Sequence, residues 1–148
     1  MKKQAGFLLL EFLLVFGIVA ILAASSVPFY SVKLVKGKLV EVTEAMESVR
    51  ISLIDFRKLH GYFPSCSDQI IIRNSLGVGI YMGREGRIKK ISVENGVIST
   101  TLQNIGTPCD EKTLTLVPLI DPSTDGVIFR YGGTLVTDAK SQAYAPRK

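Results

Sequence analysis

The chain has 148 residues, a formal net charge of +5, two cysteines and one histidine. This length predicts one folded domain rather than two. The basic excess is too small for a dedicated nucleic-acid-binding protein. A zinc site is excluded because Cys66, Cys109 and His60 are too few and too widely spaced to supply its ligands.

An apolar segment with a single charged residue stands near the start of the chain. Residues 1–6 form a short basic leader, and residues 7–30 are uncharged except for Glu11. A helix of about 24 residues spans roughly 36 Å, which is enough to cross the core of a bilayer. A carboxylate in such a segment costs on the order of a few kcal/mol, so Glu11 calls for a partner of opposite charge. A secretory signal peptide and a plain single-pass anchor are the alternatives, and neither accounts for Glu11.

The helix is predicted to continue as an amphipathic helix to His60. Apolar residues recur at spacings of three and four, at Leu39, Val42, Met46, Val49, Leu53 and Phe56. Pro28 is expected to kink the helix. Gly61 is expected to end it, with His60 in the last turn complementing the helix dipole.

The rest of the chain has the turn residues of loops and the alternation of strands. Glycine, proline and polar residues over 61–87 predict a largely irregular connection with short regular pieces. Strands are predicted at 87–93, 97–101, 112–119 and 127–131. Asn95-Gly96 marks a hairpin between the first two, and residues 134–148 predict a mixed, loosely attached tail. The fold class is therefore α+β, with a long amino-terminal helix packed on an antiparallel sheet of about three or four strands.

The run Gly6-Phe7-Leu8-Leu9-Leu10-Glu11, followed by Pro28 and Tyr30, resembles the amino-terminal signature of type IV pilins. Leu8 stands where that family usually has a threonine, and Lys33 stands where a second tyrosine is often found. The resemblance implies cleavage by a prepilin peptidase between Gly6 and Phe7 and N-methylation of Phe7. It also implies that Glu11 acts in assembly, paired with the terminal amine of Phe7.

The predicted strands at 88–98 and 112–118 resemble the central strands of major pilins, so the resemblance extends loosely over most of the chain. Many such pilins close a carboxy-terminal loop with a disulfide, whereas no cysteine follows Cys109 in this sequence. The family's usual receptor-binding loop is therefore not carried over.

The resemblance implies a structural subunit with no enzymatic activity and no cofactor. Its parts are a leader at 1–6, a transmembrane and polymerisation helix at 7–30, and a globular head at 31–148 that includes the amphipathic half-helix at 31–60. The precursor is expected in the inner membrane, single-pass with a periplasmic head. The pilus assembly machinery then polymerises copies of the chain into an extracellular filament for adhesion, twitching motility or DNA uptake. A minor pilin or type II secretion pseudopilin of low copy number, and a membrane-anchored binding protein, are the alternatives.

The two cysteines predict a disulfide between Cys66 and Cys109, since an exported head lies in an oxidising compartment. The bridge closes a loop of about 43 residues and is worth roughly 4 kcal/mol in the chain-entropy model. A pair of buried free thiols is the alternative.

A basic cluster and an acidic turn are the remaining candidate sites. The basic cluster is a candidate patch for anionic ligands such as DNA or a host surface, and consists of Arg84, Arg87, Lys89 and Lys90. Ordinary solvated strand ends are the alternative. Asp121, Ser123 and Asp125 alternate like calcium ligands but lack the glutamate that ends an EF-hand loop. Turn formation explains these residues, so no metal is predicted.

Overall fold

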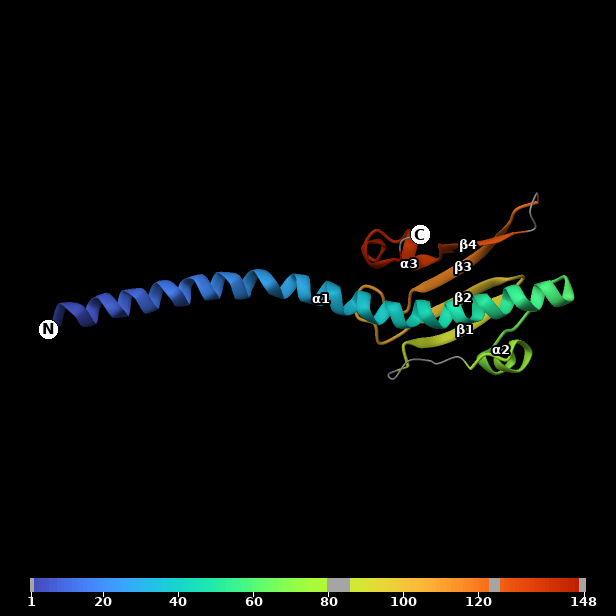
Figure 1. Ribbon diagram of the computed structural model, residues 1–148, viewed down its shortest axis with the longest axis horizontal. Coiled ribbons are helices and arrows are strands. Elements are labelled where there is room, and N and C mark those ends of the chain that lie inside the picture. Colours follow the sequence, from blue (N-terminus) through green and yellow to red (C-terminus); the bar gives the residue numbers. More distant parts are fainter. Residues whose placement is uncertain (1, 80–85, 123–125, 147–148) are drawn as a thin grey trace. The chain divides into compact units, whose positions relative to one another are not determined.

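The computed structural model describes residues 2–79, 86–122 and 126–146 (Figure 1). The chain divides into two compact units, Met1–Leu34 and Val35–Lys148. One helix, α1 (Lys2–His60), makes up the described part of the first unit and begins the second. The predicted long amino-terminal helix is therefore confirmed.

A glycine and a histidine mark the end of α1. Gly61 has a φ of +81°, a left-handed conformation that glycine adopts without a steric penalty. Its N–H donates to the carbonyl of Arg57 at 2.7 Å. The Nδ1–H of His60 donates to the carbonyl of Phe56 at 3.0 Å, and the two rings stack with centroids 4.0 Å apart. The predicted helix end at Gly61 is confirmed.

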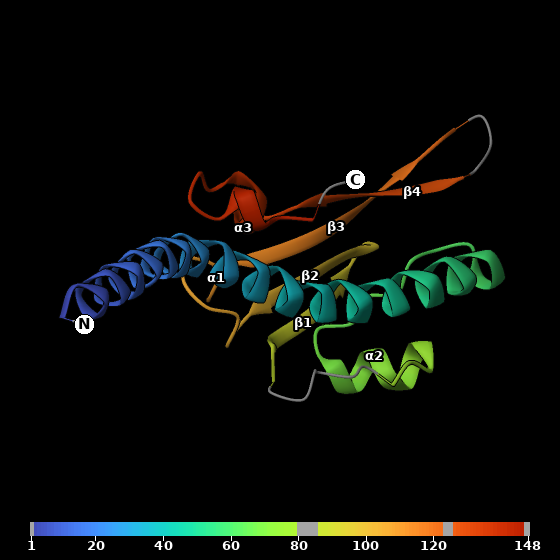
Figure 2. The ribbon, with the colours of Figure 1, turned by 60° about the vertical axis from the view of Figure 1, so that its left-hand side comes forward.

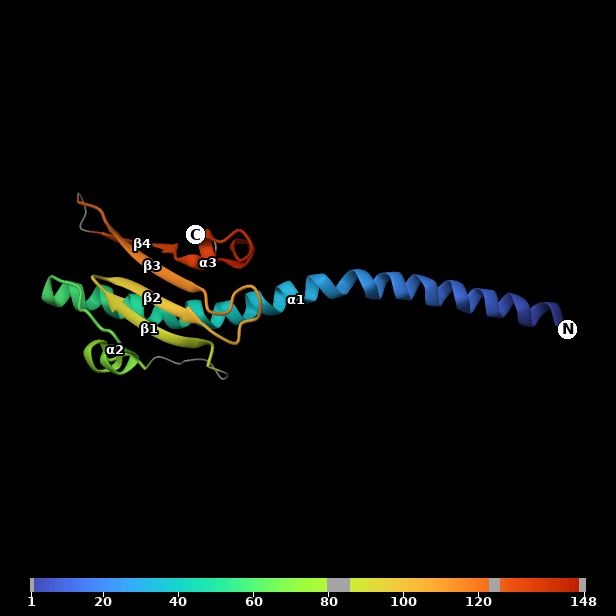
Figure 3. The same ribbon diagram turned by 180° about the vertical axis from the view of Figure 1, so that it is seen from behind.

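One stripe of α1 is buried against the sheet in the second unit, and α1 covers one face of that sheet (Figure 1 and Figure 3). The predicted apolar positions that are at most 3% exposed are Leu39, Val42, Met46, Val49 and Leu53. Phe56 is only half-buried. Each buried side chain of this kind stabilises the fold by roughly 1.5–3 kcal/mol, so the stripe is a main source of stability.

The sheet is antiparallel, with its four strands side by side in chain order. Its members are β1 (Ile88–Glu94), β2 (Val97–Leu102), β3 (Thr113–Ile120) and β4 (Val127–Gly132). All four predicted strands are therefore confirmed. Asn95 and Gly96, with φ of +50° and +83°, form the two-residue hairpin turn between β1 and β2.

The connection after α1 contains one short helix, α2 (Gln69–Leu76), which lies beside β1 (Figure 2). Asp68 caps this helix by accepting a hydrogen bond from the N–H of Ile70 at 3.3 Å. Ile72 joins the core and is fully buried. The partly buried Leu76 also packs against the core, so apolar contacts of α2 hold this segment beside β1.

The carboxy-terminal segment is folded onto the sheet, so the predicted loose tail is wrong. It contains α3 (Thr134–Thr137) and a short 3-10 helix, η1 (Gln142–Tyr144). Leu135 is fully buried in the core, and Ser141 is buried as well. The mixed composition of residues 134–148 gave no indication that Leu135 is buried, and its burial holds the segment on the sheet.

Candidate functional site

The first candidate site is the apolar surface of the first unit. The large apolar side chains from Phe7 to Leu22 are 50–72% exposed. Among the described residues, the helix over Phe7–His60 contains an 18-residue window of mean hydropathy 2.8, so it is long and apolar enough to cross a membrane. An apolar surface of this extent is stable only where lipid or protein covers it.

Glu11 is the single charged residue on this surface. It lies on α1 one turn after Phe7 and is exposed, and the two positions are about 6 Å apart along the helix axis. Once lipid or protein covers the surface, an unpaired carboxylate is strongly disfavoured, so it requires a cation within hydrogen-bond distance. The arrangement can therefore select a partner that carries an amine at the level of Glu11.

The remaining predicted positions of this segment lie within continuous helix. Gly6, Phe7 and Pro28 are all part of α1. Pro28 has no N–H and therefore omits one helical hydrogen bond, yet α1 continues past it to His60. Cleavage at Gly6, methylation of Phe7 and a kink at Pro28 stay predictions.

The predicted disulfide is wrong, because both cysteines are free and buried. Cys66 pairs with Val93, with both backbone hydrogen bonds at 2.7 Å. Cys109 lies in the β2–β3 loop, which is tied to Leu102 opposite Ile88, at the other end of β1. Those two ends are roughly 16 Å apart at about 3.3 Å per residue, whereas a disulfide needs Cα atoms within about 7 Å.

Arg87 does not contribute to a surface patch of the predicted basic cluster, because it is only 8% exposed. Its Nε lies 3.2 Å from the Oε2 of Glu41 on α1. Its Nη1 donates to the carbonyl of Asn104 at 2.8 Å, and the Nζ of Lys38 donates to the same carbonyl at 3.3 Å. Arg87 therefore ties the start of β1 and the β2–β3 loop to α1, and is not available to an anionic ligand.

The other members of the cluster differ in their surroundings. A β-bulge between Ile88 and Lys90 leaves both Lys89 and Lys90 exposed. The Nζ of Lys89 pairs with the carboxylate of Glu111 at 2.7 Å, which cancels its charge. Arg84 lies outside the described residues. Among the described members of the cluster, Lys90 is thus the one exposed cation without an ion-pair partner.

The acidic turn lies largely outside the described residues, because these exclude Ser123 and Asp125. The N–H of Asp121 donates to the carbonyl of Gly126 at 2.9 Å, which ties together the two described ends of the β3–β4 connection. Over the part of the chain that the structure describes, no three His, Cys, Asp or Glu side chains group closely enough to hold a metal ion.

A charged groove of about 570 Å³ lies between α1 and β4. Glu47 and Arg50 form an ion pair there, and the Arg50 guanidinium lies 5.8 Å from the centre of the Phe129 ring. The hydrogen bond from Arg50 lowers the pKa of Glu47, and burial raises the pKa of Tyr131. Glu47 and Arg50 neutralise each other, and Arg130, which is exposed, adds a positive charge to the lining of the groove.

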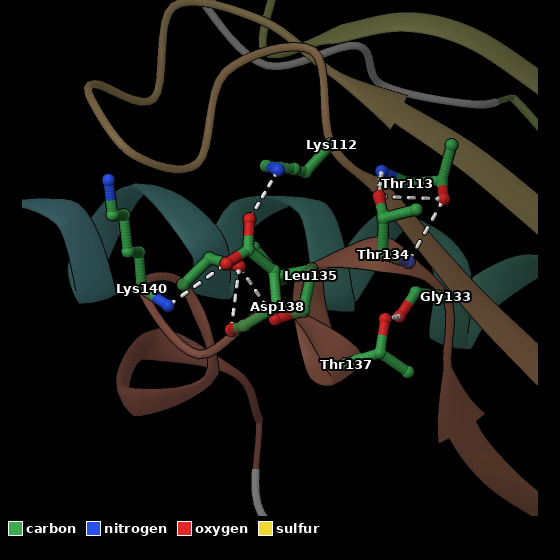
Figure 4. A network of polar contacts seen from close by, with 9 residues as sticks. Lys112, Thr113, Gly133, Thr134, Leu135, Thr137, Asp138 and Lys140 are labelled. Atoms are coloured by element: carbon green, nitrogen blue, oxygen red, sulfur yellow. Dashed lines mark hydrogen bonds and ion pairs between the residues drawn. The ribbon is translucent and has the colours of Figure 1, made fainter.

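Sequence reasoning missed the polar contacts that hold the carboxy-terminal segment to β3 (Figure 4). The Nζ of Lys112 lies 2.5 Å from the Oδ2 of Asp138. The N–H of Thr113 donates to the Oγ1 of Thr134 at 2.8 Å, and the N–H of Thr134 donates to the Oγ1 of Thr113 at 3.2 Å. The hydrogen bond from Lys112, and then that from the N–H of Lys140, lower the pKa of Asp138.

A local signal for this attachment was present in the sequence. Leu135 and Val136 form an apolar pair one residue after Gly132-Gly133, as in a turn that returns to the core. The hydroxyl of Ser141 then donates to the carbonyl of Leu135 at 3.0 Å, closing the segment on itself. The partners on β3 carried no such signal, because they are distant in sequence.

The fold and the apolar first unit together define the structural class of the protein. This is an α+β protein with one long helix, apolar and exposed at its start and packed on a four-stranded antiparallel sheet at its end. No protein-family model matches the chain.

Similar curated proteins include two type IV major pilins and a fimbrial protein. The chain is 29% identical over 116 residues to the type IV major pilin protein PilE of Neisseria gonorrhoeae, covering 76% of this chain and 66% of that one. It is 28% identical over 116 residues to a fimbrial protein of Neisseria meningitidis, covering 76% and 65%. It is 27% identical over 146 residues to PilE1 of N. gonorrhoeae, covering 96% and 76%. The chain thus spans just under two thirds of the first two relatives, and its similarity to type IV major pilins and a fimbrial protein extends over 76–96% of its own length.

Proposed function

We propose that the chain is a structural subunit of a type IV pilus, with no enzymatic activity and no cofactor. Residues 7–30 hold the precursor in the inner membrane with its head in the periplasm. A prepilin peptidase cuts it between Gly6 and Phe7, Phe7 is N-methylated, and the assembly machinery polymerises the chain into an extracellular filament. Such a filament serves adhesion, twitching motility or DNA uptake.

The observation that carries the proposal is the exposed apolar surface of the first unit with Glu11 inside it. If the protein were fully surrounded by water, leaving this surface exposed would cost a free energy of roughly 1.5–3 kcal/mol for each large side chain. Lipid covers it before assembly, and the same surface of neighbouring copies covers it in a filament. Similarity to two type IV major pilins and a fimbrial protein supports the same role.

Glu11 gives the filament its register in this proposal. Cleavage after Gly6 creates a terminal amine at Phe7, a cation that can lie against the Glu11 carboxylate once both are buried. A buried carboxylate without such a partner is costly, so copies that pack out of register are disfavoured.

Substitution of Glu11 tests the assembly role. Glu11→Leu is expected to leave cleavage and membrane levels unchanged and to reduce the chain in sheared filaments by at least about tenfold, since each 1.4 kcal/mol is a factor of ten. Glu11→Asp keeps the charge and is the matched control, expected to retain most assembly. Normal filament yield from Glu11→Leu would refute the role assigned to the carboxylate.

Mass spectrometry of the mature amino terminus tests processing. A first residue of Phe7 carrying one methyl group is expected. An intact leader on the mature chain would favour a membrane-anchored binding protein instead. The number of copies in purified filaments then separates a major subunit from a minor pilin or pseudopilin.

A further inference from the structure

The outer face of α1 in the second unit carries charge and exposed apolar side chains in alternation. Lys36, Val40, Glu44 and Ile51 are all exposed, with Val40 and Ile51 each at 51%. At 3.6 residues per turn they lie within a sector of about 80° around the helix, and at one edge of this sector Lys36 and Val40 line a groove beside the carboxy-terminal segment. We call these four residues the outer face.

Most charged side chains of α1 in this unit already have a partner within the chain. Those partnered residues are Lys38, Glu41, Glu47, Arg50, Asp55, Arg57 and Lys58. In the described part of the chain, neither Lys36 nor Glu44 has a recorded hydrogen bond or ion pair. The outer face therefore offers one cation and one carboxylate that the fold itself does not use.

The spacing of these two charges defines a displacement. Lys36 and Glu44 are eight residues apart, about 12 Å along α1, too far to pair with each other. In the pilus proposed above all copies enter the membrane the same way round, so their helices are parallel. A second copy displaced by about 12 Å along α1 brings its Lys36 level with the Glu44 of the first.

We propose that Lys36 of one copy pairs with Glu44 of the neighbouring copy and that this contact sets an axial step between pilus subunits. At this displacement Val40 of each copy lies about 6 Å along α1 from the pair, one on either side, and excludes water from it. Lys36 and Glu44 lie about 80° apart around α1, so each copy can contact one neighbour through Lys36 and another through Glu44, and the contact propagates without closing, as a filament requires. The inference rests on the proposed pilus role.

Charge reversal with rescue tests the pairing. Lys36→Glu and Glu44→Lys, each in the full chain, are expected to lower the pilin in sheared filaments by at least about tenfold, because like charges then face each other. The double reversal is expected to restore at least half of the wild-type yield. Lys140→Glu and Glu94→Lys make the same charge changes at exposed positions outside α1 and are expected to assemble normally.

Cysteine cross-linking tests the geometry. With Lys36→Cys and Glu44→Cys in one chain, oxidation of filaments is expected to give a ladder of multimers, because each copy bonds to the next. An antiparallel pairing would give dimers only, and would also cross-link Val40→Cys to itself. The native thiols do not interfere, since Cys66 and Cys109 are 1% and 0% exposed.

The outcomes separate this inference from the function on which it rests. Rescue by the double reversal together with a ladder supports the pairing. The pairing alone is overturned if the wild-type chain forms filaments and any one of three results is seen. These results are normal assembly of Lys36→Glu, no restored assembly in the double reversal, or cross-linking of the cysteine variant to dimers only. Absence of the wild-type chain from filaments overturns the pilus role and the pairing with it.

Discussion

Leu135→Ala tests whether the carboxy-terminal segment is part of the core. The side chain is fully buried among residues from α1 and the sheet. Removing a buried leucine side chain typically costs 2–5 kcal/mol, through lost burial and the cavity left behind, and we expect about 3 kcal/mol here. The unit Val35–Lys148 has an unfolding entropy of about 0.24 kcal/mol/K, so its Tm is expected to fall by about 12 °C.

The measurement is thermal unfolding of the full chain in detergent micelles, followed by near-ultraviolet circular dichroism. The chain has five tyrosines and no tryptophan, so the signal reports tyrosine packing. Leu59→Ala is the matched control, because Leu59 is 81% exposed and its loss is expected to change the free energy of unfolding by less than about 0.5 kcal/mol. Equal Tm values for Leu135→Ala and Leu59→Ala would refute the placement of the segment in the core.

The other predictions concern a buried hydroxyl, the two thiols and one ion pair. The Oγ1 of Thr100 is buried without a hydrogen-bond partner among the described residues, so Thr100→Val is expected to raise the free energy of unfolding by about 1 kcal/mol in a denaturant titration; an unchanged midpoint would contradict this. Cys66 and Cys109 are free and buried, so without reductant a maleimide is expected to add two labels per chain in denaturant and none to the folded chain. Failure to label the chain in denaturant would indicate a disulfide between the two cysteines. The pKa of Asp138 is lowered in the fold, so its pairing with Lys112 stabilises the fold above the ordinary carboxyl pKa of about 3.9 and is lost as the pH falls through the lowered value. Lys112→Met is therefore expected to reduce the loss of Tm between about pH 4 and pH 2, and identical pH profiles would argue against the pair.

The elements that sequence predicted correctly depend on short-range patterns. The apolar spacing from Leu39 to Leu53 matches one face of a helix. Asn95-Gly96 suits only a few backbone conformations, so it placed the β1–β2 hairpin correctly. Gly61 marked the end of α1 for the same reason. Each of these signals involves residues that are near neighbours in the chain.

The basic cluster and the disulfide were not predicted correctly from the sequence, because these sites depend on long-range contacts. In the sequence, Arg87 stands close to two other cations, Lys89 and Lys90. In the structure it pairs with Glu41 on α1, which is distant in the chain. The two cysteines had a plausible loop length for a disulfide. Pairing of the strands nevertheless put them at opposite ends of β1.

The sequence by itself determined the apolar first unit, the isolated Glu11 and the order of helix and strands, since composition and periodicity specify what each segment can bury. Only the tertiary structure decided which charges are used within the fold and which stay available to another copy. It paired Lys112 with Asp138 and Arg87 with Glu41, and left Lys36 and Glu44 exposed. The physical reason is that burial and ion pairing depend on which distant segments meet, and sheet register decides that.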